Sequence, residues 1–166
     1  MIVTREYPSP LGMLRLAAEE KALVELRLPQ SLAGMPGRPD DGSHPVLRAA
    51  ADWLDRYFAG ERPGTDELSL APRGTAFQQA VWRRLAAIPY GAAVTYGELA
   101  AALARERGLQ RMSPQAVGGA VGANPISIVI PCHRVLGVGG RLTGYNGGLE
   151  QKRRLLTHEG IHFAQE

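Results

Sequence analysis

The chain changes character near its middle, at residues 64–74. This stretch contains Pro72 and few large apolar residues, a composition typical of a linker between domains. Short β-rich pieces and one helical pattern precede it, and helical patterns dominate after it. A chain of 166 residues, of which 45% are hydrophobic, is long enough for two small domains with packed cores. We therefore expect an α+β protein with one domain in residues 1–74 and another in residues 75–166.

The first domain is expected to be a small α/β unit with an antiparallel sheet. Three β-rich pieces within residues 1–28, separated by turn residues such as Ser9–Gly12, predict a short antiparallel meander. Residues 29–43 are rich in Pro, Gly and Asp and predict a mobile surface loop. Apolar residues at helical spacing over Pro45–Phe58 predict a helix that ends at Gly60.

Three helices are predicted at the start of the second domain. Thr75 is placed as the N-cap of a first helix, which the sequence Pro89–Gly91 stops. Thr95 and Glu98 have the spacing of a capping box and predict the start of a second helix. The pair Ser113–Pro114 predicts the start of a third helix, with proline at its first position.

A hairpin and a fourth helix complete the expected second domain. The glycines of Val138–Leu142 predict a tight hairpin, and Leu149–Leu156 predicts a basic helix. Three helices followed by a hairpin have the order of a winged helix-turn-helix, so we expect a domain of that kind.

The third helix has an unusual composition, because Gly118, Gly119 and Gly122 lie within it. Each glycine lowers the stability of a helix by up to ~1 kcal/mol relative to alanine, so propensity does not explain them. Small residues allow close approach of another surface. That surface is either a neighbouring helix or a nucleic-acid backbone, and the composition alone does not choose between them.

The charges are distributed unevenly between the two halves. Residues 1–74 hold 9 Lys/Arg and 11 Asp/Glu, whereas residues 75–166 hold 10 Lys/Arg and 5 Asp/Glu. The second half is therefore the better partner for a polyanion.

Cys132 is the only cysteine and stands between Pro131 and His133, directly after the apolar run Ile126–Ile130. Single cysteines are most often buried and inert. Here His133 and Arg134 are expected to lower the pKa of the thiol, and Pro131 stops the apolar run where the thiol appears. The pattern favours a reactive nucleophile.

Several classes of site and location are disfavoured. One cysteine allows no intramolecular disulfide, and the lack of C-x-x-C or of a His pair at ligand spacing predicts no metal site. There is no signal-like start and no apolar run long enough to cross a bilayer. We expect a cytoplasmic protein that does not associate with membranes.

A base for the thiol is expected in His133. If residues 132 and 133 are extended, their side chains point to opposite faces, which disfavours a direct thiolate–imidazolium pair and leaves a bridging water as the connection. Glu159 is the candidate carboxylate that orients the imidazole. A capping or solvated role for Glu159 stays open.

Several short motifs occur in order between Phe77 and Gly160: Pro89–Gly91, Thr95–Tyr96, Ala116–Ala120, Asn124–Pro125, Ile130–Val135, Tyr145–Leu149 and His158–Gly160. Together they resemble the O6-alkylguanine-DNA alkyltransferases, which repair DNA by moving an alkyl group from guanine to their own cysteine. The first 74 residues resemble the family only in their coarse layout of strands and helix.

The resemblance implies a role for each residue of the candidate site. Cys132 would attack the alkyl carbon of O6-alkylguanine, or of O4-alkylthymine, and the dealkylated guanine or thymine would leave. His133 would take the thiol proton through a water, with Glu159 holding the imidazole. Tyr96 would donate to the departing guanine, and Asn124 would be the hinge between the third helix and the cysteine. Each molecule would act once, irreversibly and without a cofactor.

The resemblance also implies how DNA is bound. The partner would be double-stranded DNA, with the third helix in the minor groove and the damaged base flipped out of the stack. The protein is expected to be a monomer. Arg134, although grouped with the binding residues, is expected to be a structural charge paired near the site. The residues implied in DNA or base binding are Gln115, Ala116, Gly118, Gly119, Gly122, Arg134, Tyr145, Asn146 and Gly147.

Two departures from the family pattern stand out. Gln115 lies where human-like members have an arginine that fills the gap left by the flipped base, so base extrusion is expected to be less efficient. Some relatives bind zinc through amino-terminal cysteines, which this chain does not have.

Two other functions compete with this interpretation. A non-catalytic winged-helix protein that recognises alkylated guanine would lack the nucleophile, so Cys132 argues against it. A cysteine hydrolase is disfavoured because its cysteine and histidine would be adjacent in sequence.

Overall fold

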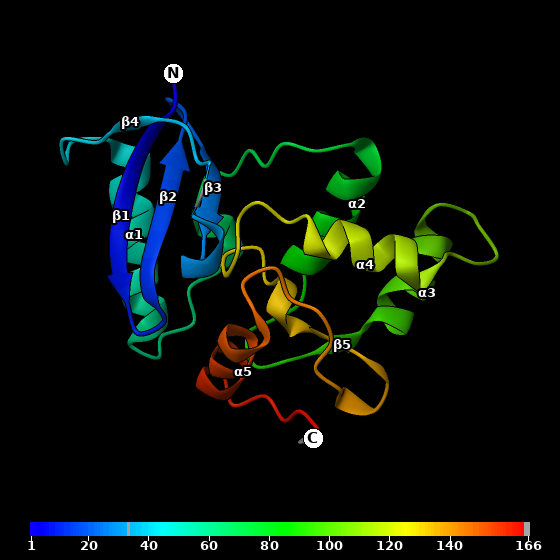
Figure 1. Cartoon of the computed structure of the whole chain (residues 1–166). Helices are drawn as coiled ribbons and strands as arrows, with labels where there is room; N and C mark the ends of the chain where they lie inside the picture. The colour runs from blue at the N-terminus through cyan, green and yellow to red at the C-terminus, as the bar shows by residue number, and fades with distance from the viewer. Residues whose placement is uncertain (33, 165–166) are drawn as a thin grey trace. The chain divides into compact units, whose positions relative to one another are not determined.

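A computed structural model describes residues 1–32 and 34–164 (Figure 1). It divides the chain into two compact units, one of residues 1–73 with 125–129 and one of residues 74–124 with the chain from 130 onward. The segment 125–129 belongs to the first unit because its backbone pairs with Leu26, whose N–H donates to the Pro125 carbonyl at 2.9 Å and whose carbonyl accepts from Ser127 N at 3.2 Å. The sequence pattern did not predict that residues 125–129 belong to the first unit.

A four-stranded sheet forms the first unit, in the order β3-β2-β1-β4. The strands β1 (Val3–Ser9), β2 (Gly12–Ala18) and β3 (Leu23–Arg27) are antiparallel, as the meander predicted. The sheet as a whole is mixed, because β4 (Arg38–Pro39) pairs in parallel with β1. Part of the expected mobile loop at 29–43 is therefore a strand, and another part is the 3-10 helix η1 (Pro29–Ser31).

Helix α1 (Pro45–Phe58) packs against the sheet, as Figure 1 shows. Its buried face consists of residues at helical spacing, among them Leu47, Trp53, Leu54 and Tyr57. The 3-10 helix η2 (Thr65–Glu67) follows, and the indole of Trp53 donates to the carbonyl of Gly64 at 2.8 Å. The stretch expected to be a linker thus packs in part on the first unit.

Capped helices form most of the second unit. Thr75 is the N-cap of helix α2 (Ala76–Ala86) and Thr95 is the N-cap of α3 (Tyr96–Glu106), each with the full capping box. Helix α4 (Pro114–Gly122) begins at Ser113, whose hydroxyl accepts from two backbone N–H groups. Helices α3 and α4 form a helix-turn-helix, and Trp82 of α2 donates to the carbonyl of Ala120 in α4 at 2.8 Å.

The rest of the second unit departs from the predicted hairpin. It contains the 3-10 helix η3 (Cys132–Arg134), the 3-10 segment η4 (Val138–Gly140) and helix α5 (Leu149–His158). Its two-stranded sheet is parallel and joins β5 (Val94–Thr95) to β6 (Val135–Leu136).

The hairpin expected at Val138–Leu142 is a short turn. Two backbone bonds close it, from Gly137 N to the Arg141 carbonyl at 2.8 Å and from Gly140 N to the Gly137 carbonyl at 3.1 Å, and the Gly140 carbonyl accepts from Ala164 N. Val138 is 86% exposed, so it has no buried face that would hold a strand in register.

The apolar run before the cysteine is also not a strand. Residues 126–130 form a bridge and a sequence of turns, and Ile128 has a φ of 71° although it is β-branched and fully buried. Such a conformation costs free energy and persists only where the surrounding structure imposes it. None of the helices in the described ranges is long and apolar enough to cross a membrane.

We expect Ser113→Ala to make helix α4 open more easily by about 1 kcal/mol, because the N–H groups of Gln115 and Ala116 lose their acceptor in a helix already weakened by glycine. Hydrogen exchange of the α4 amides would measure this change. Ser69→Ala, at an exposed position of the first unit, is the control and should leave these amides unchanged. Equal exchange in both variants would show that the cap does not hold α4.

Candidate active site

Cys132 is the first residue of η3 and is 3% exposed. Its N–H donates to the carbonyl of Ile130 at 2.8 Å, and the side chain of Asn124 donates to the same carbonyl at 2.7 Å. Asn124 lies two residues after the end of α4, so its amide group ties the chain leaving that helix to the backbone next to the thiol. The structure thus places Asn124 where a hinge between helix and cysteine would lie.

The imidazole next to the thiol is held by a buried carboxylate. His133 Nε2 lies 2.6 Å from Glu159 Oε2, and both side chains are fully buried. Arg134 donates to both oxygens of Glu159, at 2.8 and 3.1 Å, and to the carbonyl of Ile88 at 2.7 Å. The N–H of Gly91 donates to Glu159 Oε1 at 3.1 Å. The carboxylate is therefore neither solvated nor a helix cap, although it belongs to the residue that ends α5.

Arg134 is buried, 6% exposed, and stacks over the ring of Tyr90 with 5.7 Å between its Cζ and the ring centroid. All of its hydrogen-bond partners named above belong to the second unit. This is the structural, paired charge that the sequence predicted, and the arrangement leaves no free guanidinium for a contact with DNA.

These contacts define the protonation of His133. A carboxylate paired with a guanidinium only accepts hydrogen bonds, so the Nε2 atom facing Glu159 carries the proton. Burial lowers the pKa of His133, opposed by the attraction of Glu159. His133 is therefore neutral near pH 7, and its Nδ1, which has no hydrogen-bond partner among the described residues, carries the lone pair of a base.

The groups that shift the pKa of the Cys132 thiol are not the ones expected from the sequence. Burial raises the pKa of Cys132, opposed by hydrogen bonds from Asn124 and Tyr145 and by the charge of Lys152. Arg134 does not lower the pKa of the thiol, because its guanidinium is turned to Glu159. The resting thiol is therefore protonated, and its proton must be removed before sulfur can attack.

Lys152 is the site residue that the sequence analysis missed. Its side chain is fully buried in α5, and its ammonium donates to the carbonyls of Val135 at 2.6 Å and Thr143 at 3.3 Å. It also lies 5.8 Å from the ring centroid of Tyr96 and 5.9 Å from that of Tyr145. Burial lowers the pKa of Lys152 to about 8, opposed by the attraction of Cys132.

A sequence pattern for Lys152 did exist. It lies seven residues before Glu159, the C-cap of α5, and shares the buried face of that helix with Leu155 and Leu156 at helical spacing. A lysine on such a face needs a buried partner, which would have indicated a functional role.

The two tyrosines of the expected site lie beside this lysine. Burial raises the pKa of Tyr96, opposed by a hydrogen bond with Thr143. Tyr96 also lies against α4, because a Cβ at Gly118 would be 3.8 Å from its ring. Tyr145 is half-buried in the loop before α5, with Asn146 exposed and Gly147 buried after it.

The remaining expected binding residues lie on the outer face of α4. Gln115, Ala116, Gly119 and Gly122 are all exposed. A Cβ at Gly119 or Gly122 would meet nothing within 4 Å. Packing inside the protein therefore does not require glycine at these two positions.

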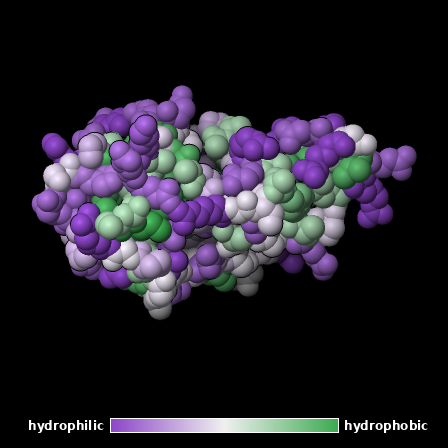
Figure 2. All heavy atoms as spheres, turned by 90° about the horizontal axis from the view of Figure 1, so that it is seen from above, coloured by the Kyte–Doolittle hydropathy of each residue, from purple (hydrophilic) through white to green (hydrophobic). Residues whose placement is uncertain are grey.

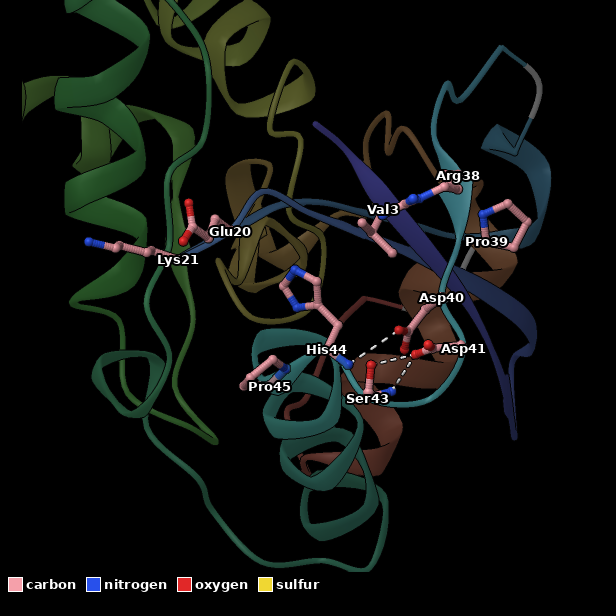
Figure 3. Close-up of a pocket in the computed structure, with 10 residues that line it drawn as sticks. All are labelled: Val3, Glu20, Lys21, Arg38, Pro39, Asp40, Asp41, Ser43, His44 and Pro45. Carbon is pink, nitrogen blue, oxygen red and sulfur yellow. Dashed lines mark hydrogen bonds between the residues drawn. The ribbon is translucent and has the colours of Figure 1, made fainter.

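A cavity in the first unit has a different character. It has a volume of about 640 Å³ and is lined by side chains of both charges, among them Lys21, Arg38, Asp40, Asp41 and His44 (Figure 3). Ser43 caps this corner by donating to Asp41 from both its N–H and its hydroxyl. No three His, Cys, Asp or Glu side chains in the described ranges are grouped so as to hold a metal ion. The hydroxyl of Ser43 is engaged with Asp41, so the site at Cys132 remains the stronger candidate for chemistry.

Fold and site together define a two-unit protein in which a helix-turn-helix precedes a buried thiol flanked by a buried histidine. Residues 2–72 match the family model for the ribonuclease-like domain of 6-O-methylguanine DNA methyltransferase, and residues 76–161 match the model for its DNA-binding domain. The chain belongs to the 6-O-methylguanine DNA methyltransferase family.

Individual relatives agree with this assignment. The methylated-DNA--protein-cysteine methyltransferase of Haemophilus influenzae is 42% identical over 95% of this chain and 86% of its own. A crystal structure of the Mycobacterium tuberculosis O6-methylguanine methyltransferase has a TM-score of 0.81 and 43% identity, covering 96% of this chain and 93% of that one. A structure of the M. tuberculosis protein in complex with DNA has a TM-score of 0.82 and 43% identity over 95% and 92% of the two chains.

We expect Glu159→Gln to destabilise the protein by about 3–5 kcal/mol, because it leaves the buried Arg134 guanidinium without its carboxylate. Urea unfolding at pH 7 would measure the loss. Glu150→Gln is the control in the same helix, since Glu150 pairs with Arg153 and Arg154 only at the surface. It should cost less than about 1 kcal/mol. Similar losses in both variants would contradict the importance of the buried pair.

We expect Lys152→Met to slow the reaction of Cys132 with iodoacetamide at pH 7 roughly tenfold, through about 1.4 kcal/mol of lost attraction for the thiolate. Because the pKa of Lys152 is about 8, its charge is present below that pH and lost above it. The difference between the two proteins should therefore shrink as the pH rises past 8. Arg153→Met, at a surface position of α5, is the control. A difference that does not depend on pH would exclude the electrostatic role.

Proposed function

We propose that Cys132 is the residue that accepts the alkyl group in this DNA-repair methyltransferase, and that the substrate is O6-alkylguanine in double-stranded DNA. The observation that carries the proposal is the arrangement around the thiol. The only cysteine of the chain is buried and protonated, and the next residue is a neutral histidine held by the Glu159–Arg134 pair. This is a nucleophile with a base that can take its proton.

The chemistry follows from these groups. The Cys132 proton passes to His133 Nδ1 through a bridging water, and Glu159 stabilises the imidazolium that forms. Sulfur attacks the alkyl carbon, so a carbon–sulfur bond forms and the carbon–O6 bond of guanine breaks. The Tyr96 hydroxyl gives a proton to the departing guanine, which then leaves uncharged. The thioether is not hydrolysed, so each molecule acts once.

Lys152 stabilises two negative charges that form during this reaction. Its ammonium lowers the pKa of the thiol and lies beside the ring of Tyr96, where negative charge develops when the hydroxyl loses its proton. A cation at this position stabilises both charges more than it stabilises the neutral resting state.

Binding of a flipped base accounts for the burial of the thiol. A substituent on O6 inside a duplex cannot reach a sulfur that is 3% exposed, so the nucleotide must leave the stack. Most side chains on the outer face of α4 are small and none is charged, which suits a close approach to the minor groove. The glycines that packing does not require, Gly119 and Gly122, lie on this face. Tyr145, Asn146 and Gly147 follow in the loop that would line the base pocket.

Gln115 lies exposed at the start of the same face. Its amide is shorter than an arginine, has no charge and offers a poorer stacking surface. We infer that it fills the gap of the flipped base less well than the arginine of human-like members. The cytoplasmic location and the monomeric state stay predictions.

Intact-protein mass spectrometry would test the proposal directly. After incubation with excess duplex containing O6-methylguanine, we expect one methyl group per protein, located on Cys132 by peptide mapping. Cys132→Ala should gain none and should still bind DNA, since phosphate contacts come from other residues. An unmodified wild-type protein that binds the duplex would indicate a non-catalytic binder. Repeated turnover would indicate a hydrolase.

A further inference from the structure

A cavity in the second unit lies at the turn between helices α3 and α4 of the helix-turn-helix. It has a volume of about 310 Å³ and lies between α3 and the loop that leads to Pro114, the first residue of α4. Arg105 of α3 and Arg111 of the loop both line it. We call this cavity the arginine groove.

The arginines at this turn have no carboxylate partners. Arg105, Arg107 and Arg111 form no ion pair with any residue in the described ranges, whereas the neighbouring Glu106 pairs with Arg84 at 3.3 Å. Arg107 instead lies 5.6 Å from the ring centroid of Phe77. The two exposed charges of Arg105 and Arg111, within seven residues of each other, are thus left for a partner molecule.

Helix α4 itself supplies no charge. Residues 113–124 contain no Lys, Arg, Asp or Glu. A protein that holds double-stranded DNA must neutralise phosphates with Lys or Arg, because counterion release provides most of the non-specific affinity. The nearest positive charges before α4 in the chain are those of the turn.

The floor of the groove is apolar. The small side chains Ala100, Ala101 and Ala104 of α3 line it together with Leu109, which is 50% exposed. Figure 2 shows apolar residues bordered by strongly hydrophilic ones at the end of the second unit where this loop lies. An apolar floor between two guanidinium groups suits a sugar–phosphate chain, whose deoxyribose is apolar on one face and whose phosphates are anionic.

We propose that the arginine groove binds the phosphodiester backbone of the DNA strand that runs beside α4, with Arg105 and Arg111 each on a phosphate. The inference rests on the proposed function, since it assumes that α4 faces DNA. It gives the uncharged α4 an electrostatic anchor at its N-terminal end, next to Gln115. The anchor positions the duplex and carries no sequence information.

The double variant Arg105→Gln with Arg111→Gln tests the proposal. Its affinity for an undamaged fluorescent duplex is measured by anisotropy between 50 and 200 mM KCl. Loss of two phosphate contacts should make the negative slope of log K against log salt shallower by about 1.8, so the fold-loss of affinity at 50 mM exceeds the fold-loss at 200 mM about 12-fold. Arg5→Gln with Arg48→Gln removes the same charge from two first-unit arginines that form no ion pair within residues 1–32 and 34–164, and it should keep the wild-type slope.

Two further measurements separate this proposal from the proposed function. Methyl transfer from free O6-methylguanine needs no duplex and should be unchanged in the groove variant. The double Lys variant at the same two positions keeps the charge and should keep the slope. A wild-type slope in the Gln variant, or a slope lowered equally in the control, would overturn the groove. Failure of transfer in the wild-type protein, with the slopes differing as expected, would overturn the proposed function alone.

Discussion

The buried carboxylate of Glu159 is the group around which the site is organised. An unpaired carboxylate at this depth would be strongly destabilising, and the bidentate contact with Arg134 offsets that cost. The same pair draws together the end of α5, the 3-10 helix η3 and the chain after α2, through Gly91 and the carbonyl of Ile88. One oxygen of the carboxylate is then available to hold His133. The position of the imidazole is therefore a consequence of the interaction that stabilises this part of the unit.

That arrangement also decides the charge state of the resting site. Arg134 balances the charge of Glu159, so little of it remains to hold a proton on His133, and burial keeps the imidazole neutral. Burial likewise keeps the thiol protonated. A thiol and an imidazole that are both uncharged cost less to bury than an ion pair. In the proposed mechanism the thiolate forms only as its proton moves, and a thiol that stays protonated reacts less readily with oxidants and electrophiles.

The local parts of this structure could be predicted from the sequence, and the long-range parts could not. Thr75, Thr95 and Ser113 were predicted as caps because a cap bonds to residues two or three positions away. Lys152 was missed because its partners, Val135 and Thr143, come from a different part of the chain. The family motifs indicated Cys132, His133 and Glu159 as a set, and the structure brings these three into one cluster. The direction of the thiol pKa was wrong, since neighbours in sequence were taken for neighbours in space.

The predictions for the hairpin at Val138–Leu142 and for the apolar run 126–130 were wrong for the same physical reason. The glycine pair at 139–140 does produce a turn, but a hairpin also needs flanking residues with a buried face, which Val138 lacks. The apolar run 126–130 has the composition of a strand, but its backbone follows Leu26 for only a short distance and then turns through Ile128. Composition reports what can be buried, whereas the neighbours available determine the shape in which it is buried.

The segment 125–129 has a consequence for how this protein can be divided. Because its backbone pairs with β3, the polypeptide passes between the two units three times, after residue 73, after residue 124 and after residue 129. A fragment beginning at Gly74 would keep every side chain of the thiol site but would lose the strand that holds Pro125 and Ser127. The five residues leading to Cys132 would then have no template for their backbone. An unrelated domain put in place of the first unit would therefore have to supply an equivalent strand edge for residues 125–127.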